Sequence, residues 1–490
     1  MNESLINPFT LSHPTAVQTS LFAGATFAKF DPTGRFIASA ARLAFSVQIW
    51  DLETRAPIRW LDGHVKAITN IDWSRNSRYL LTSSRDWNAI IWDLSSPCDP
   101  PQRHGSLRFD APVVSAYFHP KNSQIILALL ATGEAYVCDL RKQNRSRIEL
   151  LETITDEGIE EEENNGQGVM RSPMTVARFD PTGKNIFVGT ASGSILVFNT
   201  RTKTMIARHK ISGAGAMKGF DFAKSGRRLV SNSSDRTLRQ FILPSYSNPP
   251  TDTELLEQSQ PPFLDLELEP THRFNDPINR TAWHAMCYSP DGDWLAGGAA
   301  DPSGHKIYIW DISNDGQLAS PLDGGREPLL HLHWHPTRSL LASTTNMGNI
   351  LIWHHPNPER WGAFAGGFEE VDENVEYEER EDEFDIEDEE VQFQRKMKAE
   401  EEEVDIDTIV TGAQAAVLGG LGTLSGNMGG AATPIGTGPS GNYSMDIDKL
   451  GSGMGDDIEA AWAEEEPDTD IRGAWKMKVI MDSEEASEYY

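Results

Sequence analysis

The sequence predicts an all-β protein, a seven-bladed β-propeller followed by a long, largely disordered acidic carboxy-terminal tail. Three observations predict this fold: a motif that recurs seven times, a second motif about ten residues after each copy, and a change of charge along the chain. The 490 residues carry a net charge of −30. Residues 361–490 hold 35 acids and 8 bases, whereas residues 1–360 hold 38 acids and 35 bases. Nearly all of the negative charge therefore lies in the tail.

The first motif combines an aromatic residue, a turn containing Pro, Gly, Asn or Ser, and an apolar run that ends in small residues. Two typical copies are AKFDPTGRFIASAA, which begins at Ala28, and ARFDPTGKNIFVGT, which begins at Ala177. Short apolar runs bounded by turn residues are typical of β-strands. The aromatic residues of the seven copies are Phe30, Trp73, Phe118, Phe179, Phe222, Tyr288 and Trp334.

The second motif is clearest as QIWDL at 48–52, IIWDL at 90–94 and YIWDI at 308–312. A period of about 40–45 residues with Trp-Asp endings is the signature of WD40 repeats. Each repeat supplies a four-stranded blade, and closing the ring protects the strand edges. We expect the propeller to span residues 1–356, with Leu5–Leu11 as the outer strand of the last blade.

Two of the spacings between copies are long and indicate insertions. The first, at about 141–172, contains the acidic stretch DEGIEEEENNGQG, and the second, at about 244–275, contains PSYSNPPTDTELLEQSQPP. Both segments are polar and contain Pro or Gly, so they are predicted to be loops.

One blade carries polar side chains that are typical of WD repeats. Gly63-His64, Asp86 and Trp92 fit a network in which the histidine links the turn aspartate to the tryptophan across strands. A catalytic role would require a base, a nucleophile and a pocket, and the sequence has no such set at motif spacing. We interpret these residues as stabilising the fold.

The sequence contains no phosphate loop, HExxH, CxxC pair or GxSxG, so we expect no enzyme activity and no cofactor. Alternation along one predicted strand places three histidines on one face: His331, His333 and His335. Core or surface histidines are a better interpretation of them than metal ligands. The three scattered cysteines indicate a reducing compartment. No signal peptide or membrane-spanning run is recognised, and a binding scaffold is the default expectation for a propeller.

The tail combines charge with widely spaced apolar residues. Residues 369–407 hold 21 acids and 4 bases, too little apolar surface to fold alone. Solubility, or loose binding of a basic histone, would explain the charge. Binding in a basic groove would also explain the interleaved apolar residues, which would set the register while the carboxylates speed the encounter. These residues are Val375, Tyr377, Phe384 and Ile386.

WGAFAGGFEEVDENVEYEEREDEFDIEDEE at 361–390, after a degenerate seven-bladed propeller, resembles the retinoblastoma-binding protein five family. This family provides the WD-repeat core subunit of COMPASS and MLL-type histone H3 lysine 4 methyltransferases. NRTAWHAMCYSPDGDWLAGGA at 279–299 resembles the sixth blade of the same family. The resemblance implies a non-catalytic nuclear scaffold subunit that bridges a SET-domain catalytic subunit, a SPRY-domain subunit and a second WD40 propeller, and helps to engage nucleosomes. The long glycine-rich extension points to a fungal member.

The resemblance also implies the residues that bind each partner. An activating segment at 357–376 would contact the SET domain through Trp361, Phe364, Phe368, Val371, Asn374 and Val375. An acidic box at 376–390 would bind the SPRY-domain subunit through Tyr377, Glu379, Asp382, Phe384, Asp385, Ile386, Glu387 and Asp388. A motif at 400–410 would dock on the second propeller through Glu403, Val404, Asp405 and Ile406. Nucleosomal DNA would be contacted by Arg236, Arg280 and Arg326. A fourth matching position, near Asp301, is not basic, which weakens the DNA assignment or shifts it to Lys306.

Two segments complete the tail. Residues 411–455 are rich in Gly, Ala and Ser and have the composition of a flexible linker. Residues 456–490 are acidic and aromatic, and we interpret them as a further docking segment that the family motifs do not cover. The alternative to the scaffold is an acidic-tailed WD40 histone chaperone, whose binding would depend on charge and not on the order of the residues.

Overall fold

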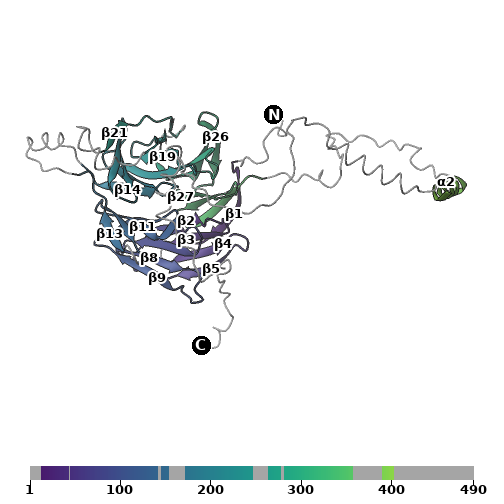
Figure 1. Cartoon of the computed structure of the whole chain (residues 1–490), viewed down its shortest axis with the longest axis horizontal. Coiled ribbons are helices and arrows are strands. Elements are labelled where there is room, and N and C mark those ends of the chain that lie inside the picture. The colour runs from purple at the N-terminus through teal and green to yellow at the C-terminus, as the bar shows by residue number, and fades with distance from the viewer. Residues whose placement is uncertain are drawn as a thin grey trace, which may run out of the picture. The chain divides into compact units, whose positions relative to one another are not determined.

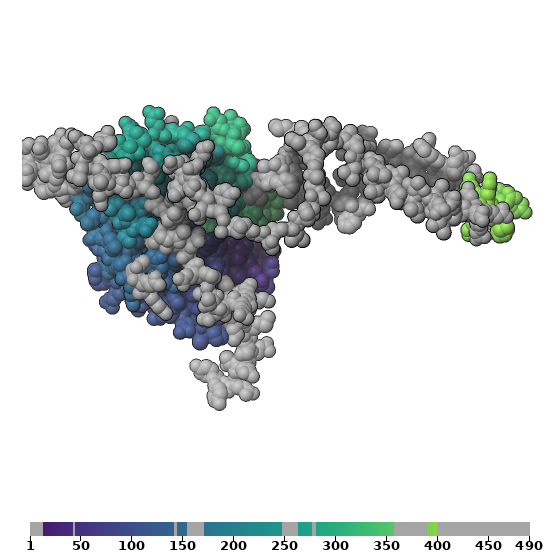
Figure 2. Space-filling view, viewed as in Figure 1, coloured from purple at the N-terminus to yellow at the C-terminus, as the bar shows by residue number. Residues whose placement is uncertain are grey.

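The computed structural model describes residues 13–42, 45–141, 145–153, 171–246, 263–276, 281–356 and 389–401. Seven β-sheets form the predicted seven-bladed propeller (Figure 1). In Figure 2 the colours pass from purple through blue and teal to green around the ring, so the blades follow the order of the chain. The first strand of each blade lines the central channel, and the next strands lie progressively further out.

The first four blades each contain consecutive strands. Blade 1 has β2 (Ala25–Phe30), β3 (Phe36–Ala41), β4 (Val47–Asp51) and β5 (Ala56–Leu61). Blade 2 has β6 (Ile68–Trp73), β7 (Tyr79–Ser84), β8 (Asn88–Asp93) and β9 (Arg103–Arg108). Blade 3 has β10 (Val113–His119), β11 (Asn122–Leu130), β12 (Ala135–Asp139) and β13 (Ser146–Glu149). Blade 4 has β14 (Met174–Phe179), β15 (Asn185–Thr190), β16 (Ile195–Asn199) and β17 (Met205–Lys210).

The remaining blades include two departures from this simple order. Blade 5 has β18 (Met217–Phe222), β19 (Arg228–Ser233), β20 (Leu238–Ile242) and β22 (His272–Phe274). Blade 6 has β23 (Trp283–Tyr288), β24 (Trp294–Ala299), β25 (Lys306–Asp311) and β26 (Gln317–Asp323). Blade 7 has β27 (Leu329–Trp334), β28 (Leu341–Thr345), β29 (Asn349–His354) and β1 (Ala16–Phe22). β21 (Leu264–Glu267) adds a fifth strand to blade 4, parallel to β17.

The ring is closed by its amino-terminal strand, which pairs antiparallel with the last strand of the repeat region, as the purple and green ribbons show in Figure 1. The closing strand is β1, so the prediction of Leu5–Leu11 for this position is wrong; that segment lies outside the described residues. Only Ala23 and Gly24 separate β1 from the first strand of blade 1. Leu21 is buried between blades 7 and 1 and pairs with Ile350, which fixes β1 at this edge.

Both predicted insertions contain strands as well as connecting chain. β13 lies within 141–172, and β21 and β22 lie within 244–275, so the prediction of loops is wrong for these residues. Edge pairing explains the difference, because each of these strands completes or extends the outer edge of a blade. Residues 154–170 and 247–262 are outside the described part of the chain.

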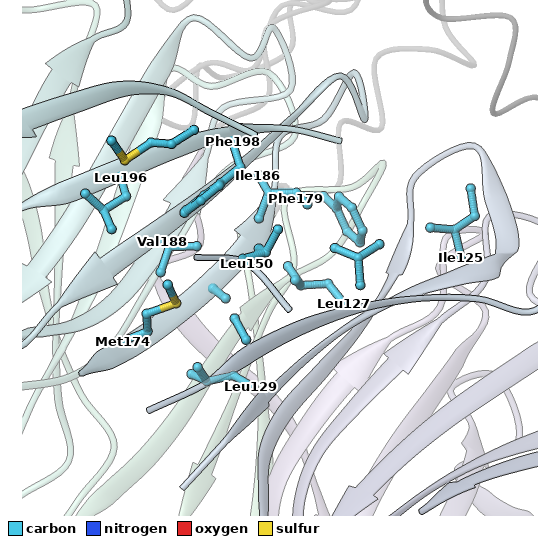
Figure 3. Close-up of a cluster of buried hydrophobic side chains, with 14 of the residues drawn as sticks. Ile125, Leu127, Leu129, Leu150, Met174, Phe179, Ile186, Val188, Leu196 and Phe198 are labelled. Carbon is cyan, nitrogen blue, oxygen red and sulfur yellow. The ribbon is translucent and has the colours of Figure 1, made fainter. Parts of the chain in front are cut away.

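The propeller has one apolar core between each pair of neighbouring blades. Figure 3 shows the core between blades 3 and 4, where Leu127 and Leu129 share a cluster with Met174 and Val188. Burying one such side chain contributes about 1.5–3 kcal/mol. Phe222 is half-buried, and the other six repeat aromatics are buried: Phe30, Trp73, Phe118, Phe179, Tyr288 and Trp334. The aromatic residues recur in the sequence because each of them packs between neighbouring blades.

The strand order gives the ring two distinct faces. Successive strands of a blade run in opposite directions, so the turn between the second and third strands lies on the same face as the connection to the next blade. We call this the connection face. The turns between the first and second strands, and between the third and fourth, form the opposite face.

Within the tail, α2 (Glu389–Glu401) is a helix of 13 residues. This helix departs from the disorder predicted for most of the tail. It forms because QRKMKAEE is rich in strong helix formers and Lys398 lies in the last turn, near the negative end of the helix dipole. Val391, Phe393 and Met397 are exposed on it. In the described part of the chain, no helix has the length and hydropathy needed to span a membrane.

Candidate functional site

The central channel, of about 820 Å³, contains charged groups that join neighbouring blades. Lys29 Nζ lies 2.5 Å from a carboxylate oxygen of Asp72, and the Arg178 guanidinium lies 2.7 Å from a carboxylate oxygen of Asp221. The other oxygen of each carboxylate accepts a backbone amide of the following blade at 2.8 Å. Each aspartate therefore holds three blades together, which is a structural role.

Two of the three alternating histidines, His333 and His335, have separate hydrogen-bond partners, whereas Nδ1 of His331 has none among the described residues. The backbone amide of Phe30 donates to His333 Nδ1 at 3.3 Å, and His335 Nε2 lies 2.9 Å from the carbonyl oxygen of Gly34. Burial lowers the pKa of His331 to about 3 and that of His333 well below its usual value, so both rings are neutral. Among the residues that the structure describes, no three His, Cys, Asp or Glu side chains are grouped so as to hold a metal ion.

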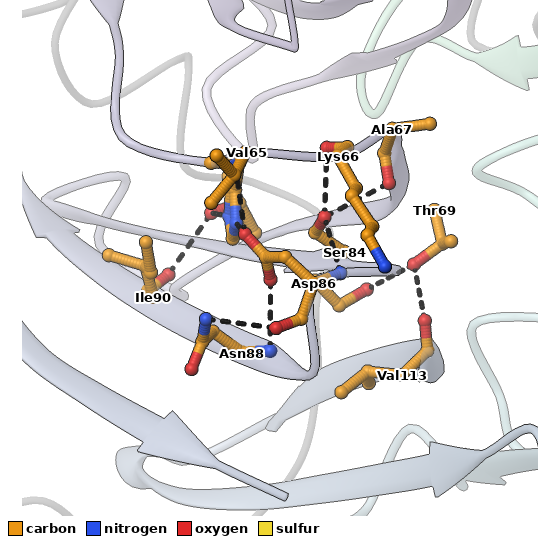
Figure 4. A network of polar contacts seen from close by, with 12 residues as sticks. Val65, Lys66, Ala67, Thr69, Ser84, Asp86, Asn88, Ile90 and Val113 are labelled. Atoms are coloured by element: carbon orange, nitrogen blue, oxygen red, sulfur yellow. Dashed lines mark hydrogen bonds and ion pairs between the residues drawn. The ribbon is translucent and has the colours of Figure 1, made fainter. Parts of the chain in front are cut away.

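The polar network predicted in blade 2 is present, with one additional member. His64 Nδ1 lies 2.8 Å from Asp86, and His64 Nε2 lies 2.8 Å from the Thr82 hydroxyl. The Trp92 indole N–H donates to the same hydroxyl at 2.9 Å, so histidine and tryptophan are linked through Thr82. Burial lowers the pKa of His64, and its neutral ring donates from Nδ1 to Asp86 and accepts from Thr82 at Nε2. Figure 4 shows Asp86 fixing the connection-face turn, since it also accepts the Val65 amide.

In six of the seven blades, the turn between the second and third strands contains a residue in the left-handed conformation. In blades 3, 4 and 7 this residue is glycine: Gly133, Gly193 and Gly348. In blades 1, 2 and 5 it is Phe45, with φ of 52°, Trp87, with φ of 73°, and Arg236, with φ of 68°. A side chain in this region costs on the order of 1 kcal/mol. These three turns therefore present a large side chain at the position where blades 3, 4 and 7 have glycine.

Two of the three predicted DNA-binding arginines are described, and both lie on this connection face. Arg236 is exposed in the turn after β19, and Trp283 Nε1 donates to its carbonyl oxygen at 3.1 Å. Arg326 is exposed in the connection from blade 6 to blade 7. Arg280 is outside the described residues. The fourth position that the family resemblance assigned to DNA binding lies near Asp301. Lys306 Nζ lies 3.6 Å from a carboxylate oxygen of Asp301, which partly neutralises the charge of the lysine.

The predicted partner-binding residues of the tail lie outside the described residues, within 357–388 and 402–490. This holds for all contacts assigned to the SET-domain, SPRY-domain and second-propeller partners. Sequence analysis missed Trp87, although a tryptophan between Asp86 and Asn88 in a tight turn was a usable signal, because turns favour small polar residues.

Comparison with known proteins finds one family model, several relatives and a solved structure that are similar to this chain. The model of the WD domain, G-beta repeat, matches residues 55–93 and 270–311. The Set1 complex component swd1 of Schizosaccharomyces pombe is 33% identical over 391 residues, covering 78% of this chain and 90% of the relative. The retinoblastoma-binding protein 5 homolog of Drosophila melanogaster is 32% identical, covering 78% of this chain and 72% of the relative. The solved β-propeller domain of Cps50 (Swd1) from Myceliophteria thermophila is 30% identical, with a TM-score of 0.56, and covers 68% of this chain and 97% of that structure.

Proposed function

Because the chain belongs to the family of retinoblastoma-binding protein 5 and Swd1, we propose that it is a non-catalytic scaffold subunit of a COMPASS-type histone H3 lysine 4 methyltransferase complex in the nucleus. One observation carries the proposal. Relatives at 32–33% identity over 78% of this chain include a Set1 complex component, and the propeller architecture is the one solved for Swd1. A ring with separate blade cores is a rigid base from which a tail can bind several partners.

The tail would bind three partners in chain order. The activating segment at 357–376 would contact the SET-domain subunit, the acidic box at 376–390 the SPRY-domain subunit, and the motif at 400–410 the second WD40 propeller. α2 begins at the end of the acidic box and ends at the start of the propeller-docking motif, and its 13 residues span about 20 Å. This helix supports the proposal because it would act as a spacer that keeps the two partners apart.

The effect on methylation would be indirect. Binding the SET domain in its competent conformation raises the fraction of active enzyme, and a preference of about 1.4 kcal/mol changes that fraction by up to tenfold. Nucleosome engagement would come from the connection face, where Arg236 and Arg326 are exposed. Contacts of this kind with DNA phosphates do not depend on base sequence and weaken with salt.

Pull-down of the SPRY-domain subunit by the full chain tests the acidic box. Phe384→Ala combined with Ile386→Ala should abolish the pull-down, because the carboxylates alone do not fix the position of the peptide on the SPRY-domain subunit. Phe393→Ala is the matched control, since Phe393 is an exposed aromatic of α2 outside the box. Unchanged pull-down by the double variant would refute the assignment, and thermal melting of the propeller checks that the fold is retained.

A further inference from the structure

The connection face of blades 7, 1 and 2 exposes a group of large apolar side chains. The exposed fractions are Phe22 80%, Val65 76%, Met347 70%, Trp87 40% and Phe45 38%. We call these five residues the apolar patch. Each lies in a turn between second and third strands, or at a connection between blades. Apolar side chains gathered on one face in this way mark an interaction surface, whereas single exposed ones do not.

Hydrogen bonds hold the first part of the patch together. Arg42 lies in the turn of blade 1, and its guanidinium donates to the carbonyl of Asn346 at 2.8 Å. Asn346 precedes Met347 in the turn of blade 7. The backbone amide of Arg42 donates at 3.0 Å to Gly24, which is two residues after Phe22. The turns that carry Phe22 and Met347 are therefore bonded to the same residue of blade 1.

The second part of the patch is held by the blade 2 network. The backbone amide of Val65 donates at 3.1 Å to Asp86, the residue before Trp87 (Figure 4). Trp87 occupies the left-handed position that is glycine in three other blades. A tryptophan with this φ strains the backbone, and a glycine would not. Packing in the core does not compensate for the strain, because the Trp87 side chain is 40% exposed. Binding of another chain segment would explain it.

Three cations lie in the turns and the connection that carry the apolar patch. Arg42, Lys66 and Arg85 are exposed on the same face, and none of them forms an ion pair with another described residue. Apolar side chains such as Val65 and Met347 contribute little to binding a phosphate backbone, so the surface suits a polypeptide better than DNA. The matching ligand is an acidic peptide with a few large apolar anchors.

We propose that the apolar patch binds residues 456–470 of this same chain. This segment has eight acids and no base, and it contains Ile458 and Trp462. The carboxylates would lie near Arg42, Lys66 and Arg85, while the two apolar side chains cover the patch. This inference goes beyond the proposed function, which gives residues 456–490 no role.

The tail is long enough for this contact. The 99 residues at 357–455 separate the last blade from the segment. Without the 13 residues of α2, the other 86 could reach at most about 280 Å if fully extended, so chain length does not prevent the contact. The strands of the ring have about six residues and are only about 20 Å long, so the tail can pass from the opposite face to the connection face. Because the segment is tethered, its binding is intramolecular and does not depend on the protein concentration.

Hydrogen exchange of the full chain tests the proposal. Ile458→Asp combined with Trp462→Asp should speed amide exchange at residues 62–67 and 84–88, by about tenfold if the segment binds with a Kd about tenfold below its effective concentration. Trp87→Gly combined with Met347→Asp should speed exchange within 456–470. Glycine adopts the φ of 73° without strain, so the fold should be kept, which thermal melting checks.

Ile242→Asp is the matched control, because Ile242 is 60% exposed on the opposite face and should change neither region. Exchange that is unaffected by the tail variant would overturn the proposal. A faster exchange at the patch caused by Phe384→Asp with Ile386→Asp would assign the surface to the acidic box instead. Protection that appears only when nucleosomal DNA is added would also overturn it.

Discussion

His335 Nε2 lies 2.9 Å from the carbonyl oxygen of Gly34, and this bond joins the last blade to the first. His119 repeats the arrangement, since its Nε2 lies 2.9 Å from the carbonyl oxygen of Gly183 between blades 3 and 4. Each histidine follows or ends the first strand of a blade and reaches the corresponding turn of the next blade. The contact that closes the ring is therefore the same one that joins an internal pair of blades.

Gly34→Ala should weaken this closure strongly. Gly34 has φ of 82°, and an added Cβ would overlap the His335 imidazole. Gly226 is the matched control because it occupies the equivalent turn of blade 5, with φ of 71° and its nearest neighbours at 3.7 Å. Both variants should lose about 1 kcal/mol from backbone strain, and Gly34→Ala about 2 kcal/mol more. Urea unfolding measures the difference, and equal losses would show that the imidazole contact is unimportant.

Thr82→Val should destabilise blade 2 by about 2–4 kcal/mol, because the buried Trp92 indole and His64 imidazole would each lose a partner. Ser231→Ala is the control. Ser231 has the same position in blade 5, and its buried hydroxyl has no hydrogen-bond partner among the described residues. Its removal should cost little. Chemical denaturation measures both changes, and similar losses in the two variants would contradict a role for the network.

Acidification should destabilise the propeller through its buried histidines. Burial lowers the pKa of His119 from 6.5 to about 4, so between these values the unfolded chain binds more protons than the folded one. Stability should therefore fall as pH drops from 6.5 towards 4, by at most about 3 kcal/mol for this residue. His119→Gln should show a shallower pH dependence of the unfolding free energy, whereas the exposed His104→Gln should match the wild type. If the unfolding free energy depends on pH equally in all three proteins, protonation of His119 does not cause the loss of stability in acid.

Arg236→Glu combined with Arg326→Glu should weaken nucleosome binding and reduce its dependence on salt. If each arginine contacts one phosphate, the slope of log K against log salt should fall by about 1.8. Arg227→Glu is the control, since Arg227 is exposed on the opposite face of blade 5. Titrations at several salt concentrations provide the measurement. If Arg227→Glu lowers the affinity for nucleosomes as much as the double variant does, binding depends only on the total charge of the propeller.

The sequence predicted the repeat and its aromatics because each blade is specified locally. Tyr288 and Trp334, for example, recur beside turns and are buried between blades, so their pattern is visible without the structure. The closing strand was misplaced because β1 pairs with β29, more than 300 residues away, and no local pattern records that partner. β21 was missed because all four of its residues are exposed and show no apolar alternation. The apolar patch was missed because its members come from five separated turns and connections.

The proposed function rests on the order of residues within 372–390, the stretch that contains the acidic box. The most direct measurement is the affinity of the full chain for the SPRY-domain subunit when 372–390 is shuffled at constant composition. If the apolar side chains of the scaffold bind at fixed positions on the partner, the shuffled chain should lose about a hundredfold in affinity, equivalent to about 2.7 kcal/mol. An unchanged affinity, together with retained binding of free histones, would contradict the scaffold and favour an acidic-tailed histone chaperone.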